Sequence, residues 1–376
     1  MSEKQPSETI STNQTCAIIM AGGIGERFWP LSQPNKPKQF LPFGTNNNTL
    51  IQDALERATQ IAPLENIYIA TSKELKPIFE TIGLLPPSQI LAEPCRRNTA
   101  GCLSFVLANL LAKQQDLTDI TMAVLTADQR IEPLENFVKV ANVIIQYVAT
   151  HDVLGIIGIP PTRPETGFGY IEAIHEQKIN INDINIYPLK KFHEKPKETV
   201  AKSYIKSKNF YWNSGMFFWN VKTFLNELHK ASPIHWDSII QMKNAVINND
   251  SEKVEAVFNN LPDISIDYAL MEKTNNVVVA EAIFQWDDLG SWTSLERVLP
   301  KDENGNILHG NSVCLKSNNS IIYNDDTIPI TITTLGIENL VVAVSNGVVL
   351  IMNKKEAQNL KQLLEKFKQS KKNNEQ

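Results

Sequence analysis

Short, uniformly apolar runs alternate with helix-like segments up to about residue 300 of this 376-residue chain. The runs that we predict as strands are residues 16–21, 66–71, 120–128 and 153–159. The segments that we predict as helices are residues 49–60, 73–82, 98–115 and 134–149. Because such runs are too apolar for a sheet with one face in water, we expect a mainly parallel sheet covered by helices on both faces. The pattern is typical of a Rossmann-like, doubly wound α/β domain.

The sequence changes in character after about residue 300. Short β-branched runs separated by Gly, Asn and Asp predict a small β domain of stacked strands, and a Lys-rich amphipathic segment at 354–369 predicts a terminal helix. No fixed period predicts a full repeat array. The polar N-terminus lacks the apolar stretch of a signal peptide. We therefore expect a disordered tail at 1–15, an α/β domain at 16–300 and a small β domain with its helix at 301–376.

Composition argues against two classes of function. The formal net charge of −5 gives no overall attraction to nucleic acid. No run approaches the roughly 18 consecutive apolar residues that a membrane span needs, so we expect no membrane association. The four cysteines form no C-x-x-C pair and no metal-spaced cluster, which favours reduced thiols in a cytoplasmic protein. These are Cys16, Cys95, Cys102 and Cys314.

A glycine-rich loop with fixed cations follows the first apolar run, in AIIMAGGIGERFWPLSQPNKPKQFLPFG at 17–44. A dinucleotide-binding loop needs a third glycine, but Phe28 stands at that position and Pro30 interrupts any helix. A P-loop needs Gly-Lys-Ser/Thr after four intervening residues, which is absent. What remains is a long loop whose backbone N–H groups can line a triphosphate, with Arg27 and Lys38 as cations. The alternative is a tight turn beside solvated lysines.

The compound pattern G-G-x-G-x-R-x-W-P-L-x(6)-K-Q-F-L is far more specific than GGxG alone. It resembles the signature of the sugar-phosphate nucleotidylyltransferases, and in detail that of the mannose-1-phosphate guanylyltransferases. Further similar segments follow in the expected order: EPCRRNTA at 93–100, LTADQ at 125–129, TGFGYIE at 166–172, FHEKP at 192–196, WNSGMFFW at 212–219, SIDYALMEK at 265–273 and WDDLGSW at 286–292. The chain stops after the small β domain, so we expect it to lack the isomerase domain fused in longer members.

The resemblance implies a nucleotidyltransferase fold of the GT-A-like type with a β-helix-like C-terminal domain, and it implies one reaction. A phosphate oxygen of mannose 1-phosphate attacks the α-phosphorus of GTP, so that GDP-mannose forms and diphosphate leaves. It also implies Mg²⁺, which prefers hard oxygen ligands and bridges phosphate oxygens. The expected partners are therefore small molecules, and a homodimer is a further expectation.

Two aspartates are the expected metal ligands. Asp128 ends the run MAVLTAD, at the carboxyl edge of a predicted strand, where ligands of open α/β sheets collect. Asp288 matches the family's W-x-D-x-G pattern, and Asp287 is the neighbour that could be mistaken for it. The alternative for either is a turn or a helix cap. Gln129 stands where this family usually has a histidine, so we expect altered fine positioning without loss of activity.

The remaining residues implied by the resemblance divide by substrate. Those expected at the nucleotide are Ala21, Gly22, Gly23, Gly25, Glu93, Asn98, Thr99 and Asp128. Those expected at the sugar are Gly169, Glu172, Lys195 and Asn213, and the three cations expected to be catalytic are Arg27, Lys38 and Lys195. Glu93 can accept the N1–H and N2–H₂ donors of guanine, a paired edge that adenine lacks. It could equally hold Arg96 or Arg97 in an ion pair.

Three other functions remain as alternatives. The first is a nucleotidylyltransferase that uses another hexose 1-phosphate or nucleoside triphosphate, against which the strings RNTA and WNSGMF argue. The second is a catalytically silent regulatory homologue, which should have lost Arg27, Lys38 or a metal aspartate. The third is a glycosyltransferase of similar topology, which would need a D-x-D motif that TADQR does not supply.

Overall fold

The computed structural model describes residues 15–113, 119–325 and 330–374, so the tail expected at 1–15 lies outside the described residues except for Thr15. Contacts divide the chain into two compact units. The first comprises Met1–Gly22, Ala54–Ala127 and Ile131–Gln285, and the second Gly23–Asp53, Asp128–Arg130 and Trp286–Gln376. The chain crosses between them after Gly22, after Ala127, and within α1 (Leu50–Thr59), β5 (Arg130–Glu132) and β12 (Gln285–Asp287). No helix in the described part of the chain is long and apolar enough to cross a membrane.

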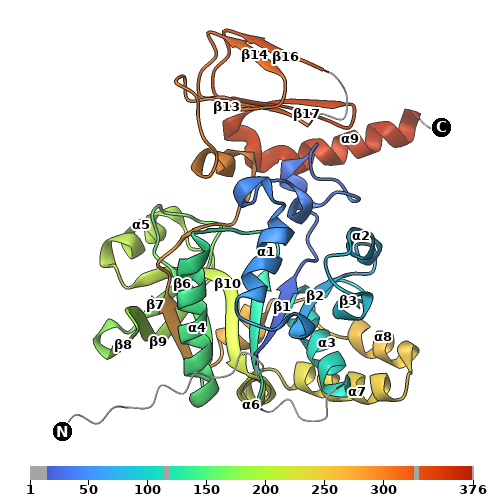
Figure 1. Cartoon of the computed structure of the whole chain (residues 1–376), viewed down its shortest axis with the longest axis vertical. Coiled ribbons are helices and arrows are strands. Elements are labelled where there is room, and N and C mark those ends of the chain that lie inside the picture. The colour runs from blue at the N-terminus through green and yellow to red at the C-terminus, as the bar shows by residue number, and fades with distance from the viewer. Residues whose placement is uncertain (1–14, 114–118, 326–329, 375–376) are drawn as a thin grey trace. The chain divides into compact units, whose positions relative to one another are not determined.

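The first unit is built on one sheet, which has ten strands among the described residues (Figure 1). Its strands follow the order β3-β2-β1-β4-β10-β6-β11-β9-β7, with β8 paired to β9. Their bounds are β1 Thr15–Met20, β2 Ile67–Ser72, β3 Ile90–Glu93, β4 Thr121–Thr126, β6 Leu154–Ile159, β7 Tyr170–Ala173, β8 Ile179–Ile181, β9 Ile184–His193, β10 Phe210–Asn220 and β11 Val277–Glu281. The four strands predicted from sequence are confirmed as β1, β2, β4 and β6, and the α/β fold class is confirmed with them.

The sheet is mixed, which corrects the expectation of a mainly parallel one. Strands β3, β2, β1 and β4 run parallel, as do β6 and β11, but β10 is antiparallel to β4, β6 and β7. β9 is antiparallel to β7, β8 and β11. One reason is the turn between β8 and β9, where Asn182 and Asp183 take φ values of 48° and 65°. Such a two-residue turn joins only antiparallel strands.

Helices cover this sheet, and the four predicted from sequence are confirmed as α1 to α4. The helices are α2 Lys76–Ile82, α3 Asn98–Lys113, α4 Leu134–Thr150, α5 Glu198–Ser207, α6 Val221–Ala231, α7 Pro233–Ile247 and α8 Ser251–Asn259. α4 packs on β6 and β10, while α3 packs on α7, which in turn contacts α8 (Figure 1). α3 is apolar almost all round because it is buried on most sides, with Phe105 edge-on to Phe258 at 5.7 Å.

The second unit contains stacked short strands and a terminal helix (Figure 1). One sheet has the order β13-β15-β17-β18 and the other pairs β14 with β16. The bounds are β13 Ile307–His309, β14 Ser312–Leu315, β15 Ile321–Asn324, β16 Ile332–Leu335, β17 Leu340–Ser345, β18 Val348–Asn353 and α9 Leu360–Asn374. β13, β15 and β17 stack in parallel, as do β14 and β16, which confirms the expected β-helix-like domain and terminal helix.

The glycine-rich segment 23–53 shares a hydrophobic core with these strands. The ring of Phe28 lies 5.1 Å from Phe43 and 5.7 Å from Trp292, and Phe43 lies 5.9 Å from Tyr323. All four rings are buried. The loop that carries Arg27 and Lys38 is therefore packed on the C-terminal β strands, although the sequence places it about 250 residues or more before them.

Candidate active site

The glycine-rich loop closes tightly around the stem of Lys38. Gly25 has a φ of 73°, and a Cβ atom added there would lie 2.3 Å from Cβ of Lys38. Ser32 Oγ donates to the Gly25 carbonyl at 2.7 Å, and the Lys38 N–H donates to the Ile24 carbonyl at 3.0 Å. Only glycine tolerates both this backbone conformation and this close approach. Gly25 therefore lets the lysine side chain pass through the turn.

Lys38 is buried and reaches both segments that carry the expected metal ligands. Its side chain is 8% exposed, and Nζ donates to Oδ2 of Asp128 at 2.9 Å. Nζ also donates to the backbone carbonyl of Asp288. A buried ammonium group needs such partners because desolvation of an unpaired charge is costly. The structure thus brings together Lys38, Asp128 and Asp288, as the sequence predicts.

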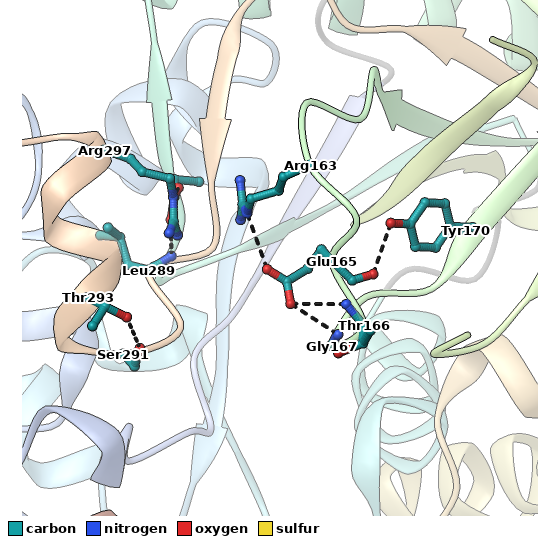
Figure 2. Close-up of polar contacts among 10 residues, drawn as sticks. Arg163, Glu165, Thr166, Gly167, Tyr170, Leu289, Ser291, Thr293 and Arg297 are labelled. Carbon is teal, nitrogen blue, oxygen red and sulfur yellow. Dashed lines mark hydrogen bonds and ion pairs between the residues drawn. The ribbon is translucent and has the colours of Figure 1, made fainter. Parts of the chain in front are cut away.

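The two neighbouring aspartates at 287 and 288 have different surroundings. Asp287 is buried, and its carboxylate accepts hydrogen bonds from Nε and Nη2 of Arg297 and, at 2.9 Å, from the Leu289 N–H. Arg297 and Leu289 are labelled in Figure 2. The Asp288 carboxylate accepts no hydrogen bond from a residue that the structure describes. The carboxylate oxygens of Asp288 are therefore available to a ligand, whereas those of Asp287 already accept hydrogen bonds from the protein.

Charge is concentrated around Asp288. Burial raises the pKa of its carboxyl group, and the nearby Asp287 and Asp128 raise it further, against the opposing effects of Lys38 and Arg27. Arg27 itself is exposed, and its Nη1 lies 3.6 Å from the point where a Cβ on Gly290 would stand. Burial is the largest cause of this raised pKa, so a cation bound at the carboxylate would favour its ionised form.

The donor set at Asp128 and Asp288 fits Mg²⁺, which commonly takes only one or two carboxylates from a protein. No group of three or more His, Cys, Asp or Glu side chains that could hold a metal occurs within the described ranges. The available oxygens of Asp288 and the partly exposed carboxylate of Asp128 meet the need of a hard cation. The assignment of the two ligands stays a prediction.

Gln129 follows Asp128 and is buried. Its Oε1 accepts a hydrogen bond from Nε1 of Trp286 at 2.8 Å. The amide therefore links the turn that holds Asp128 to the segment that holds Asp288. The effect of glutamine in place of the family's usual histidine on activity stays a prediction.

Glu93 ends β3 and is only 8% exposed. Its Oε2 is buried without a hydrogen-bond partner among the described residues, and its Oε1 lies 3.6 Å from the point where a Cβ on Gly22 would stand. Burial raises the pKa of this carboxyl group to about 7; Arg96 lowers it, and Glu74 and Asp263 raise it. Neither Arg96 nor Arg97 forms an ion pair with Glu93 in the described part of the chain. The guanidinium group of Arg97 instead donates to the backbone carbonyls of Arg96 and Asn259.

Asn98 and Thr99 begin α3, and four residues separate them from the end of β3. Asn98 has a φ of 56°, and its Oδ1 accepts the Thr99 N–H at 2.9 Å. Thr99 Oγ1 accepts the Ile266 N–H at 2.8 Å, which ties the start of α3 to the segment before Asp267. Ala21, just before the glycine-rich loop, is held by two hydrogen bonds. Its N–H donates to the carbonyl of Ala70 at 2.7 Å, and its carbonyl accepts a hydrogen bond from Thr71 Oγ1.

The expected sugar residues gather around Asn213, with one exception. The Asn213 N–H donates to the Gly169 carbonyl at 2.9 Å, and its Nδ2 donates to Asp267 at 2.7 Å. A Cβ on Gly169 would lie 2.7 Å from Oε2 of Glu194, and Glu194 accepts a hydrogen bond from Nζ of Lys195. This contact, more than the opposing burial, raises the pKa of Lys195.

Glu172 is the exception. Its two carboxylate oxygens contact Lys190 Nζ at 2.7 Å and His193 Nε2 at 3.3 Å. Within the described residues, no hydrogen bond or ion pair joins it to Asn213 or Lys195. The structure therefore places Glu172 on β7 with different partners from the other sugar residues.

Comparison with known proteins identifies the family to which the chain belongs. Residues 16–305 match the family model described as nucleotidyl transferase. The chain belongs to the nucleotidyl transferase family. Residues 310–367 also match the model of the mannose-phosphate isomerase/GMP-like β-helix domain, in the second unit. Members of the nucleotidyl transferase family generally use a divalent metal ion.

Relatives place this nucleotidyl transferase more narrowly, among the mannose-1-phosphate guanylyltransferases. A mannose-1-phosphate guanylyltransferase of Klebsiella pneumoniae is 36% identical over 94% of this chain and 74% of its own length, and one of Escherichia coli gives the same values. A Thermus thermophilus structure described as a mannose-1-phosphate geranyltransferase superposes with a TM-score of 0.82 at 31% identity, covering 94% of this chain and 99% of that one.

Sequence reasoning assigned no role to two carboxylates that contact the expected sugar residues, Glu194 and Asp267. Asp267 bonds Asn213, and burial and then Glu194 raise its pKa against the hydrogen bond from Asn213. It begins a short π-helix, Asp267–Met271, a form that is rare and often marks functional positions. The available signal was the acid inside SIDYALMEK, a segment already similar to the family's.

Proposed function

We propose that this nucleotidyl transferase couples GTP to mannose 1-phosphate, forming GDP-mannose and releasing diphosphate. The observation that carries the proposal is the buried contact of Lys38 with Asp128 and with the backbone of Asp288, on a loop of the family's pattern. Support for guanine and mannose comes from relatives of that name at 36% identity over 94% of the chain. A panel of nucleoside triphosphates and hexose 1-phosphates with Mg²⁺, read by diphosphate release, tests it: another preferred pair, or no turnover, contradicts it.

The second unit carries the residues proposed for the phosphates. Backbone N–H groups of Gly23 and Gly25 line the triphosphate, while Arg27 and Lys38 neutralise charge that builds up in the transition state. Asp128 and Asp288 would hold a Mg²⁺ ion, which would supply positive charge to offset that of the phosphates. Because both reactants are anions, the protein's main task is to position them and offset their repulsion.

The first unit carries the residues proposed for the base and the sugar. Ala21, Gly22, Glu93, Asn98 and Thr99 are assigned to the nucleotide. Gly169, Glu172, Lys195 and Asn213 are assigned to mannose 1-phosphate, with Lys195 as the cation. Glu194 and Asp267 orient Lys195 and Asn213 through the contacts described above.

Glu93 supplies a prediction on base recognition and pH. Its unpartnered, buried oxygen suits the two N–H donors of guanine, and these donors favour the ionised carboxylate. Because its pKa is raised to about 7 in the free protein, GTP binding must release a proton below that pH. The KM for GTP should therefore rise as the pH falls from about 8 to about 6, by up to about tenfold per unit.

The variant Glu93→Gln should lose this pH dependence and lower kcat/KM for GTP by about 10- to 100-fold. ITP lacks the N2 amino group, so the GTP/ITP preference should fall as well. Because its pKa is raised, the Glu93 carboxyl stabilises the fold at low pH, and this contribution is lost as the pH rises through about 7. At about pH 8 the variant should therefore have the same Tm as the unaltered protein. The exposed Glu56→Gln is the control. A lower Tm with an unchanged GTP/ITP ratio would make Glu93 a structural residue.

We further propose that residues 16–300 are the catalytic domain and that 301–376 hold the catalytic loop in place without supplying a catalytic side chain. Phe367 of α9 lies 5.0 Å from the ring of Trp29, and Lys368 pairs with Glu26 at 3.0 Å. Both contacts flank Arg27. Trp292 Nε1 also donates to the Trp29 carbonyl at 3.1 Å.

Phe367→Ala should therefore lower Tm and raise the KM for GTP by about 3- to 10-fold, because the segment around Arg27 loses its packing partner. Lys366→Ala, an exposed change one position earlier, is the control and should alter neither.

A chain ending at residue 300 should aggregate, since it exposes the apolar core around Phe28 and Phe43. A soluble, fully active fragment of that length would refute the proposed role.

The expected homodimer stays a prediction, which light scattering on the purified chain tests.

A further inference from the structure

Leu289 follows Asp288 directly and has an unusual backbone conformation. Its φ is 46°, in the left-handed region that glycine adopts readily and a bulky residue rarely does. Of the non-glycine residues with positive φ in the ranges that the structure describes, Leu289 alone is apolar, since the others are Asn, Asp or Lys. The short polar side chain of Asn or Asp can hydrogen-bond locally in this conformation, whereas leucine cannot. Such a strained residue persists only where its surroundings hold it in place.

The side chain of Leu289 is anchored in the core of the second unit. It is 0% exposed and belongs to the same hydrophobic core as Phe28, Phe43 and Trp292. Burial of a whole leucine side chain stabilises a fold by more than one left-handed residue costs. The core can therefore hold the backbone of Leu289 in a conformation that this residue would not adopt alone.

Hydrogen bonds fix the backbone on both sides of the Asp288 side chain. The Leu289 N–H donates to Oδ1 of Asp287 at 2.9 Å (Figure 2), and Asp287 is itself held by Arg297. The carbonyl of Asp288 accepts a hydrogen bond from Nζ of Lys38. All five residues belong to the second unit. The turn that carries Asp288 is therefore held by the core at one residue and by hydrogen bonds at its neighbours.

Gly290 leaves room for the Asp288 carboxylate beside this turn. A Cβ atom on Gly290 would lie 2.9 Å from Oδ2 of Asp288 and 3.6 Å from Nη1 of Arg27. The carboxylate thus lies against the backbone of the residue that follows Leu289. Because it accepts no hydrogen bond from a described residue, the backbone of the turn sets its direction.

We infer that Leu289 is a positioning residue for the divalent cation: its buried side chain holds the turn in the left-handed conformation and so aims the Asp288 carboxylate at the cation. The inference rests on the proposed function, because it takes Asp288 as a metal ligand. A ligand that packing holds in place loses less conformational freedom when the cation binds, which strengthens binding. The sequence motif that contains Leu289 gave this residue no role.

The first test compares glycine with alanine at residue 289. At an ordinary buried position glycine gives the less stable protein, because it makes the unfolded chain more flexible. At a left-handed position the order reverses, so Leu289→Gly should have a Tm a few degrees above that of Leu289→Ala. Leu350 on β18 is the matched control, because it is 2% exposed in the same core and has no positive φ. There Leu350→Gly should melt below Leu350→Ala.

The second test is Mn²⁺ binding to the full-length protein, followed by electron paramagnetic resonance well below each Tm. Leu289→Gly and Leu289→Ala should both bind Mn²⁺ about 10-fold more weakly than the unaltered protein, an effect typical of losing the support of a metal ligand. Leu350→Ala should lower the Tm but leave Mn²⁺ affinity unchanged. Leu289→Met keeps a long apolar side chain and should stay close to the unaltered protein in both measurements.

Two results would overturn the inference. Unchanged Mn²⁺ affinity in Leu289→Ala would make the leucine a core residue only. The same Tm order at residues 289 and 350 would show that no left-handed strain is held there. If both truncated variants fail to fold, Leu289→Val decides, because it keeps most of the buried volume while its branched side chain disfavours the left-handed conformation. It should bind Mn²⁺ more weakly than Leu289→Met, and equal affinity would overturn the inference. Failure of the proposed function is distinct, because the unaltered protein would then form no GDP-mannose.

Discussion

Asp288→Asn is expected to lower kcat at saturating GTP and mannose 1-phosphate by about 100- to 1,000-fold, whereas Asp287→Asn should act mainly on stability. The reason lies in their partners. The Asp288 carboxylate accepts no hydrogen bond from a described residue, so its oxygens are available to a divalent cation. Asp287 is committed to Arg297 and the Leu289 N–H. The measurement is a rate titration with Mg²⁺, together with Mn²⁺ binding followed by electron paramagnetic resonance.

Thermal unfolding separates the two variants further. Asp288→Asn removes one of three neighbouring carboxylates from a buried setting, so its Tm should stay level or rise. Asp287→Asn weakens the hydrogen bonds of a buried carboxylate at a cost of about 1–3 kcal/mol, and its Tm should fall by several degrees. If instead Asp287→Asn loses Mn²⁺ binding and Asp288→Asn does not, the ligand is the earlier aspartate of the motif.

Lys38→Met is expected to lower kcat/KM for GTP by about 100-fold or more, because it removes the buried cation assigned to the phosphates. Methionine keeps an apolar stem that fits past Gly25. The change also leaves Asp128 without its partner at 2.9 Å and removes the effect that lowers the pKa of Asp288. A lower Tm should therefore accompany the kinetic loss. Steady-state rates and a melting curve at the same pH measure both.

Lys36→Met provides the control for that experiment. Lys36 lies two positions earlier and pairs with Asp325 at 2.9 Å, at a partly exposed position. It should affect Tm slightly and kcat/KM for GTP little. If Lys38→Met matches this control in turnover and differs only in Tm, the lysine is a structural cation.

The sequence predicts the helices and the buried parallel strands well, and the reason is local. Strands such as β4 and β6 are uniformly apolar because both their faces are buried, and that pattern needs no knowledge of distant partners. The antiparallel strands β7 to β10 depend on turns such as Asn182–Asp183 and on pairing across the sheet. The packing of the 23–53 segment on the C-terminal strands depends on contacts between aromatic side chains that are nearly 300 residues apart in the sequence, such as Phe43 and Tyr323.

The same limit applies to the candidate site. Motifs indicate Lys38, Asp128 and Asp288, and the structure brings them together. They do not reveal that Lys38 is buried, since its partner Asp128 lies 90 residues later. Asp267 had no predicted role because the contact that marks it is with Asn213 on β10, 54 residues earlier in the chain. A site formed by side chains from distant segments leaves no local pattern in the sequence.

The most direct test of the proposed reaction follows the phosphate oxygens. Mannose 1-phosphate labelled with ¹⁸O in its non-bridging phosphate oxygens is incubated with the purified chain, GTP and Mg²⁺, and mass spectrometry reads both products. If a phosphate oxygen of the sugar attacks the α-phosphorus of GTP, GDP-mannose should retain the full label, the released diphosphate should contain none, and chelation of the metal should stop both products. Label in the released phosphate or diphosphate, or diphosphate release without GDP-mannose, would contradict the account.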